Sequence, residues 1–136
     1  MAETKVTING ETDASGAWIA YSPALGGWSA NPAGGLYTYY RIGKLVTVNV
    51  SQPNNGTSNA STAVIGLPFT AVSRTNAQWD APAKITDNGV AKTVPGMAVI
   101  TSAATSMTVV LDWGFNAFTA SGGKRIESCT ITYEAA

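Results

Sequence analysis

The chain has 136 residues and a mass of 14.0 kDa, and its eight basic and eight acidic residues give a formal net charge of zero. A neutral chain without a cluster of lysines or arginines is a poor candidate for binding nucleic acid or an anionic membrane surface. The chain has no histidine, which is the commonest general base and metal ligand, and its single cysteine, Cys129, excludes an internal disulfide.

The sequence contains no segment that approaches the roughly 20 consecutive apolar residues of a membrane span. Its first residues also lack the apolar core of a signal peptide. We therefore expect a protein that is made in a cytosol and does not insert into a membrane. The length fits one folded domain, since domains most often have roughly 100–150 residues.

Residues 1–17 are predicted to form an N-terminal arm in front of a β-rich domain at 18–136. In the arm, Val6 and Ile8 alternate with polar residues, which is the pattern of a strand, and Asn9-Gly10 is a turn signal. A strand without a partner in its own sheet offers unpaired backbone groups to another chain. The arm, with Val6 and Ile8, is therefore predicted to attach the protein to a larger structure.

Alternating residues predict two strands at 36–42 and 46–50, separated by a turn at Gly43-Lys44. The faces of the first strand carry Leu36, Thr38, Tyr40 and Ile42 on one side, and Tyr37, Tyr39 and Arg41 on the other. The Pro-Asn-Asn-Gly run at 53–56 is typical of a tight hairpin turn, because Asn and Gly accept a positive φ.

The second half of the chain repeats this pattern of short strands and turns. Asp87-Asn88-Gly89 predicts a hairpin, and Pro95-Gly96 predicts a break. Further strands are predicted at 63–69, 83–85, 90–92, 97–100, 107–113 and 128–133. About eight short strands with no helix between them indicate an all-β fold, an antiparallel β-sandwich or barrel.

Four segments of the chain carry specific motifs. They are Trp18-Ile19-Ala20-Tyr21-Ser22-Pro23, the Y-x-R-x-G-K-x-V-x-V run at 39–48, Gly56-Thr57-Ser58-Asn59 with Gly66-Leu67-Pro68-Phe69, and residues 118–124 with Ile131-Thr132-Tyr133. In this order they resemble a bacteriophage virion domain found at the C-terminal tips of tail fibres and minor tail proteins. The resemblance spans residues 18–133, and it implies a jelly-roll-like sandwich that assembles as a homotrimer.

In tail fibres this module follows a long shaft, whereas this sequence shows none. We therefore expect it to be carried by another virion component, such as a lattice of the major capsid protein. The preferred hypothesis is a bacteriophage virion structural protein, a homotrimeric module that decorates or cements the particle after assembly in the bacterial host cytoplasm. The alternative is a receptor- or glycan-binding tip domain of a tail fibre, with a host surface glycan as its partner.

Candidate binding residues for the alternative are aromatic, because a flat ring can stack on the apolar face of a sugar. They are Trp28, placed in a glycine-rich loop, Tyr37, Tyr39, and Trp79 beside the hydrogen-bonding carboxylate of Asp80. Large rings are also enriched in cores and subunit interfaces, and that alternative stays open for each of them.

Other prominent side chains have simpler interpretations. Trp18 and Trp113 are assigned to packing, and Cys129 is assigned to the core as a small apolar residue. Arg41 is predicted either to bind a carboxylate of another subunit or of the carrier, or to stack under a tyrosine ring. Lys44 is assigned to a solvated turn.

The sequence offers little for catalysis. A glycosidase needs two facing carboxylates, and the acidic residues are scattered, with Asp112 and Glu127 as the only conceivable pair. No phosphate-binding loop or metal-ligand cluster is present in the sequence. We therefore predict a protein that is not an enzyme and that uses no catalytic residue, metal or other cofactor.

Overall fold

The computed structural model describes residues 6–8, 11–13 and 17–136, and every regular element in them is a β-strand. The strands are β1 (Val6–Ile8), β2 (Glu11–Asp13), β3 (Ile19–Ala20), β4 (Leu25–Gly26), β5 (Trp28–Ala30), β6 (Leu36–Ile42), β7 (Leu45–Ser51), β8 (Gly56–Ser58), β9 (Ala63–Gly66), β10 (Gln78–Asp87), β11 (Val90–Ala91), β12 (Gly96–Thr101), β13 (Ser106–Val110) and β14 (Gly123–Glu134). In these ranges there is no helix of the length and apolarity needed to cross a membrane.

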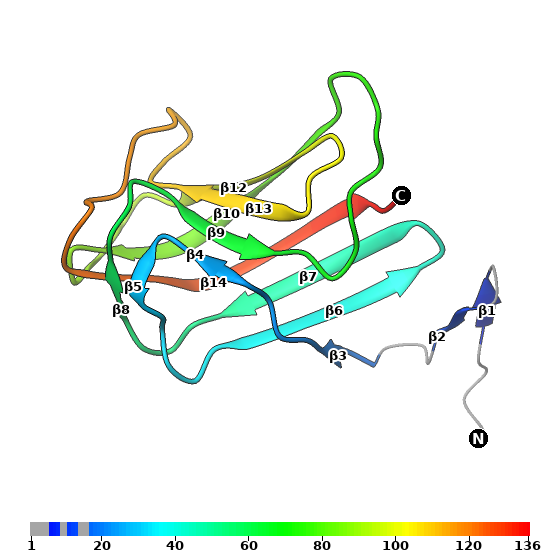
Figure 1. The fold of residues 1–136 in the computed structure, drawn as a ribbon, viewed down its shortest axis with the longest axis horizontal. Coiled ribbons are helices and arrows are strands. Elements are labelled where there is room, and N and C mark those ends of the chain that lie inside the picture. The colour runs from blue at the N-terminus through cyan, green and yellow to red at the C-terminus, as the bar shows by residue number, and fades with distance from the viewer. Residues whose placement is uncertain (1–5, 9–10, 14–16) are drawn as a thin grey trace.

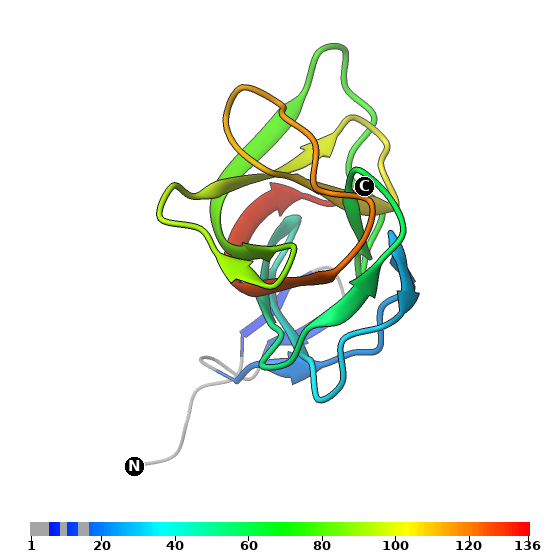
Figure 2. The same cartoon turned by 90° about the vertical axis from the view of Figure 1, so that its left-hand side faces the viewer.

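Twelve of the strands form one antiparallel sheet whose main path runs β3-β6-β7-β14-β10-β12-β13-β9-β4. This sheet curls around its own core into a half-barrel (Figures 1 and 2). The prediction of an all-β, antiparallel fold is confirmed. Nine strands form this path, and β5, β8 and β11 branch from it, so the division into two packed sheets and the jelly-roll connectivity stay predictions.

The two edges of the curled sheet are linked by the chain between β3 and β4. The Tyr21 amide donates to the Tyr37 carbonyl (3.0 Å) beside β3, and the Gly66 amide donates to the Ala24 carbonyl (2.8 Å) beside β4. The Tyr21 hydroxyl also donates to the Gly66 carbonyl at 3.0 Å. Residues 21–24 therefore bridge β6 and β9, which lie at opposite ends of the strand order.

The core follows from the alternation of the central strands. Val46, Val48 and Val50 of β7 are fully buried, and Cys129 and Ile131 of the neighbouring β14 face the same interior. Both strands therefore have the two-sided pattern that their sequences predict, and Cys129 lies in the core as expected.

One predicted hairpin is confirmed and another is wrong. β10 and β11 form a two-residue hairpin in which Asn88 and Gly89 adopt φ of 50° and 75°. The run at 53–56 does not join two paired strands, because β8 pairs with β14 and β5 rather than with β7. The reason is Gln52, whose side-chain oxygen accepts from the Ile126 amide (2.7 Å) and directs the chain across β14.

The number of strands exceeds the predicted eight, because β3, β4, β5 and β8 have only two or three residues and show no alternation. The arm also differs from its prediction. β1, which contains Val6 and Ile8, pairs with β2 in a separate two-stranded sheet, so it is not a strand without a partner. The Asn9-Gly10 turn lies outside the described residues.

Candidate functional site

The first group of motif residues meets around Phe69, inside the curled sheet. The Arg41 guanidinium lies 4.2 Å above the Phe69 ring, and its Nε donates to the Gly43 carbonyl at 2.7 Å. The Tyr39 ring contacts Phe69 edge to face at 5.3 Å, and the Tyr133 hydroxyl donates to the Phe69 carbonyl at 2.7 Å. Arg41 thus stacks on a phenylalanine rather than a tyrosine, while its predicted contact with a carboxylate of another subunit stays a prediction.

Aromatic rings continue this group, which we call the Phe69 cluster, through the interior. Tyr21 contacts Tyr37 and Tyr39 at 6.4 and 5.9 Å, and Trp79 contacts Tyr133 at 6.4 Å. Burial raises the pKa of Tyr133 to about 12. This placement supports the core interpretation of Tyr37, Tyr39 and Trp79 that the sequence left open.

Asp80 does not join Trp79 in one site, because successive residues of β10 point to opposite faces of the sheet. Trp79 packs against the core, whereas Asp80 is exposed on the outer face. There its carboxylate accepts a hydrogen bond from the side-chain amide of Gln78 at 2.9 Å.

A second cluster, which contains the motif residues Phe118 and Lys124, lies at the other end of β14. The Lys124 side chain is fully buried, and its Nζ donates to the Ala60 and Thr62 carbonyls at 3.1 and 2.9 Å. The rings of Trp28 and Phe118 lie 5.0 and 5.3 Å from the same Nζ. Burial lowers the pKa of Lys124 to about 8, although the negative charge of Asp87 opposes this shift.

Trp28 belongs to this Lys124 cage and not to an exposed loop. It opens β5, it is 7% exposed, and its indole nitrogen donates to the Lys124 carbonyl at 3.0 Å. The preceding Gly27 has φ of 95°, and a Cβ there would lie 2.2 Å from the Thr62 carbonyl oxygen. Because Gly26 and Gly27 precede Trp28, the sequence predicts a loop there. In the structure, Gly27 instead allows the backbone to approach that of Thr62 closely. A ring buried in this way has no open face for a sugar.

The four motif segments therefore converge in two packed clusters at opposite ends of β14. No family model matches the chain, and no curated protein matches its sequence.

Exposed apolar side chains mark the outer surface at three places. The first, the β6 patch, consists of Trp18, Leu36, Ile42 and Leu45 on one face of the sheet, whereas the exposed Ile19 pairs with Tyr39 and lies on the opposite face. The second, the β11 patch, consists of Val90 and Val94, and the third consists of Trp113 and Phe115 in the loop after β13. Trp18 and Trp113, which are assigned to packing, are 50% and 51% exposed, so neither packs in the core of its own chain, and packing in a subunit interface stays a prediction.

Polar side chains of β7 and β14, beside the β6 patch, form hydrogen bonds with one another across the two strands. The Thr47 and Thr132 hydroxyls are 2.9 Å apart, and the Asn49 amide donates to the Thr130 hydroxyl at 2.8 Å. Trp18 lies against Tyr40 with ring centroids 6.4 Å apart. A partner that covers this face would meet few unpaired polar groups, which lowers the cost of removing water.

The loop at 112–116 presents its two rings on a fixed backbone. The Asp112 carboxylate accepts from the Gly114 amide (2.8 Å) and from the Asn116 side chain (2.9 and 3.1 Å). Phe115, which is 61% exposed, has φ of 61°, a conformation that bulky residues rarely adopt. Strand β13 ends at Val110 because Asp112 turns the chain, and for this reason the predicted alternation does not continue to Trp113.

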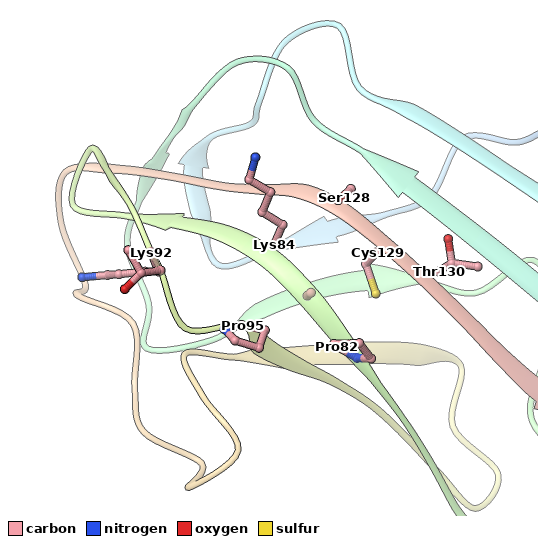
Figure 3. A pocket seen from close by; sticks show the side chains of 9 residues that line it. Pro82, Lys84, Lys92, Pro95, Ser128, Cys129 and Thr130 are labelled. Atoms are coloured by element: carbon pink, nitrogen blue, oxygen red, sulfur yellow. The ribbon is translucent and has the colours of Figure 1, made fainter.

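A pocket of about 540 Å³ lies on β10 and β14, and we call it the β10–β14 pocket. Its lining comes from residues 82–84 of β10, from residues 128–130 of β14, and from Lys92, Thr93 and Pro95 between β11 and β12 (Figure 3). Lys84, Ser128 and Thr130 point to the same side of the two strands (Figure 3). The lining therefore combines apolar side chains such as Pro82 and Pro95 with two lysines, Lys84 and Lys92.

The carboxylates of Asp112 and Glu127 are not arranged as an acid and a base. Hydrogen bonds from Asn116 lower the pKa of Asp112, and Lys84, Thr86 and Arg125 lower that of Glu127. A general acid near neutral pH needs a raised pKa instead. Burial also raises the pKa of the Cys129 thiol to about 12, which makes it a poor nucleophile. Within 6–8, 11–13 and 17–136 no three metal-ligating side chains come together.

Sequence reasoning missed the 112–116 loop and the pocket. A signal for the loop was present, because Asp112 is the only charged residue between Lys92 and Lys124, and it precedes Trp-Gly-Phe-Asn. An aspartate followed two residues later by glycine favours a side-chain-capped turn, which ends a strand. The pocket combines three segments distant in sequence, and no local pattern predicts it.

Proposed function

We propose that this protein is a structural component of a bacteriophage particle, a homotrimeric module that decorates or cements the particle. It acts by burying apolar surface against its own copies and against a larger carrier. The observation that carries the proposal is the separation of the exposed large apolar side chains into three places on different elements. Several separate apolar surfaces fit a protein that contacts several neighbours at once.

The β6 patch is the surface that we assign to the carrier. It joins apolar side chains to a face whose polar groups are already paired, as in Asn49 with Thr130. Its Trp18 lies in the chain between the β1–β2 hairpin of the arm and β3, and it contacts Tyr40 of β6. The arm and the patch therefore act together as the attachment surface.

The phage assignment is supported by the resemblance of the four motif segments to the tail-fibre and minor-tail-protein domain. Three of these segments supply Tyr39, Phe69 and Tyr133 to one cluster. These three residues contact one another, so the segments that carry the resemblance belong to one packed cluster.

A second candidate function is a receptor- or glycan-binding tip, and the exposure of Trp113 and Phe115 favours it. Two rings on a fixed loop can stack on sugar rings, a role that the buried Trp28 cannot fill. The candidate partner in this case is a host surface glycan.

The two functions respond differently to removal of the arm. If the protein decorates a particle, deletion of residues 2–14 leaves a folded trimer that no longer binds capsids. If it is a receptor-binding tip, the same deletion leaves binding to host cells intact, and Trp113→Ala abolishes it. Full occupancy of capsids by the truncated protein contradicts the attachment role, and loss of cell binding in Trp113→Ala favours the second candidate.

A further inference from the structure

The 112–116 loop and the β10–β14 pocket fit each other in polarity and charge. The loop extends from the sheet between β13 and β14 (Figures 1 and 2), whereas the pocket is a hollow of about 540 Å³. The loop offers two exposed rings, and the pocket offers the apolar side chains of Pro82 and Pro95. Pockets of roughly 300–1,000 Å³ hold drug-sized ligands, so there is room for these side chains.

The charges of the two surfaces also favour contact between the loop and the pocket. Asp112 gives the loop its only charge, which is negative, and the pocket contains Lys84 and Lys92. The side chains of these lysines are 66% and 36% exposed, although each also contacts a carboxylate of its own chain. A loop with a single negative charge is a poor match for nucleic acid or an anionic membrane, because both repel it.

We propose that the 112–116 loop of one copy docks in the β10–β14 pocket of the next copy. The inference rests on the self-association in the proposed function, and it names the surfaces that meet. Loop and pocket are different surfaces, so the contact runs head to tail, and a rotation that closes produces a ring such as a trimer.

Hydrogen bonds fix the backbone of the loop on both sides of its two exposed rings. Asp112 fixes its first half, and on the return the buried Phe118 donates its amide to the Ser61 carbonyl at 2.8 Å. The Thr119 amide and hydroxyl then donate to the Asp87 carboxylate at 2.9 and 3.1 Å. Because the rings of Trp113 and Phe115 stay exposed, they do not fill the pocket of their own chain. A loop fixed in its bound conformation loses less entropy on docking.

The contact can be tested with one loop variant and one pocket variant. The loop variant is Trp113→Ala with Phe115→Gly, in which glycine suits the positive φ, so that the backbone is retained. The pocket variant is Ser128→Trp, which fills the pocket from an exposed position of β14. Leu36→Ser is the matched control, because Leu36 is 67% exposed on the β6 patch. Near-ultraviolet circular dichroism establishes that each variant is folded.

We expect the wild type and Leu36→Ser to associate, and each of the two other variants to run as a 14.0 kDa monomer in light scattering. A mixture of the loop variant with the pocket variant contains one intact loop and one intact pocket per pair. It is therefore expected to give a heterodimer of twice the 14.0 kDa chain mass and no larger species.

Failure of this inference is distinguishable from failure of the proposed function. A monomeric wild type contradicts self-association itself. An associated wild type with an equally associated loop variant overturns only the loop–pocket contact, and so does a mixture that gives no heterodimer. A loop variant that keeps the wild-type mass but no longer binds host polysaccharide assigns the loop to a glycan instead.

Discussion

The two ends of β14 bury polar groups in different ways. At the Tyr133 end, a neutral phenol donates one hydrogen bond to the Phe69 carbonyl among aromatic rings. At the Lys124 end, an ammonium lies between two carbonyls and two rings, with no carboxylate within ion-pair distance among the described side chains. The side chains at both ends are buried within the sheet, whereas the large exposed apolar side chains lie elsewhere.

The largest effect is expected from Trp28→Ala in the Lys124 cage. Loss of a buried indole removes packing against Lys124 and the hydrogen bond to its carbonyl, and it should lower the free energy of unfolding by about 3–5 kcal/mol. The matched control is Trp113→Ala, the same substitution at an exposed position, which should change it by about 0.5 kcal/mol or less. Urea unfolding of dilute protein measures both, and equal effects would contradict the assignment of the two tryptophans.

The Lys124 end should also make stability depend on pH. The native pKa of Lys124 is about 8, below its usual 10.5, so between pH 8 and 9 the native state releases a proton that the unfolded chain retains. The unfolded state then binds more protons, and the free energy of unfolding should rise with pH by on the order of 1 kcal/mol. Above pH 9 the Cys129 thiol ionises only in the unfolded chain, because its native pKa is about 12, and this opposes the rise.

Two variants separate these contributions. In Lys124→Met the rise between pH 8 and 9 should vanish. In Cys129→Ala it should extend further above pH 9, until Tyr21, Tyr37 and Tyr133, whose native pKa values burial raises, ionise in the unfolded chain near pH 10 and oppose it. Urea unfolding across this pH range provides the measurement. A rise of wild-type size in Lys124→Met would show that another group is responsible.

At the Tyr133 end, Tyr133→Phe should have a smaller effect. The substitution removes only the hydroxyl that donates to the Phe69 carbonyl and leaves the ring contact with Trp79. A buried carbonyl without its donor should cost about 1–2 kcal/mol. Thermal unfolding checks this value, and an unchanged midpoint would mean that the hydroxyl is dispensable.

The smallest effect is expected outside both ends, for Phe115→Gly in the exposed loop. Glycine accepts the φ of 61° that phenylalanine adopts at a cost, so the monomer should gain up to about 1 kcal/mol. The melting temperature of dilute protein tests this change. A clear loss of stability would mean that the Phe115 ring packs within its own chain.

Most of the central sheet could be predicted from the sequence. The strand at 36–42 has the predicted bounds, because alternation over seven residues is a clear signal, and the Asn88-Gly89 hairpin follows from its turn chemistry. The short strands and the path after Gln52 could not be predicted. They depend on contacts such as that of Gln52 with Ile126, which are distant in sequence.

The candidate surfaces were harder to predict than the fold. An aromatic residue next to polar neighbours looks the same in a core strand and in a loop, so Tyr37 and Trp79 were candidates for a surface although they pack inside. Trp113 continues the alternating run that predicts a strand at 107–113, but Asp112 interrupts this run with its own hydrogen bonds. Only the three-dimensional arrangement separates these cases.

The most direct test of the central claim is the position of the protein on intact virions. Electron microscopy of particles that carry a labelled copy of this chain should show label at regular positions over the head, and the label should disappear when residues 2–14 are deleted. Label confined to the tail tip, or particles that form without any label, would contradict a decorating or cementing role.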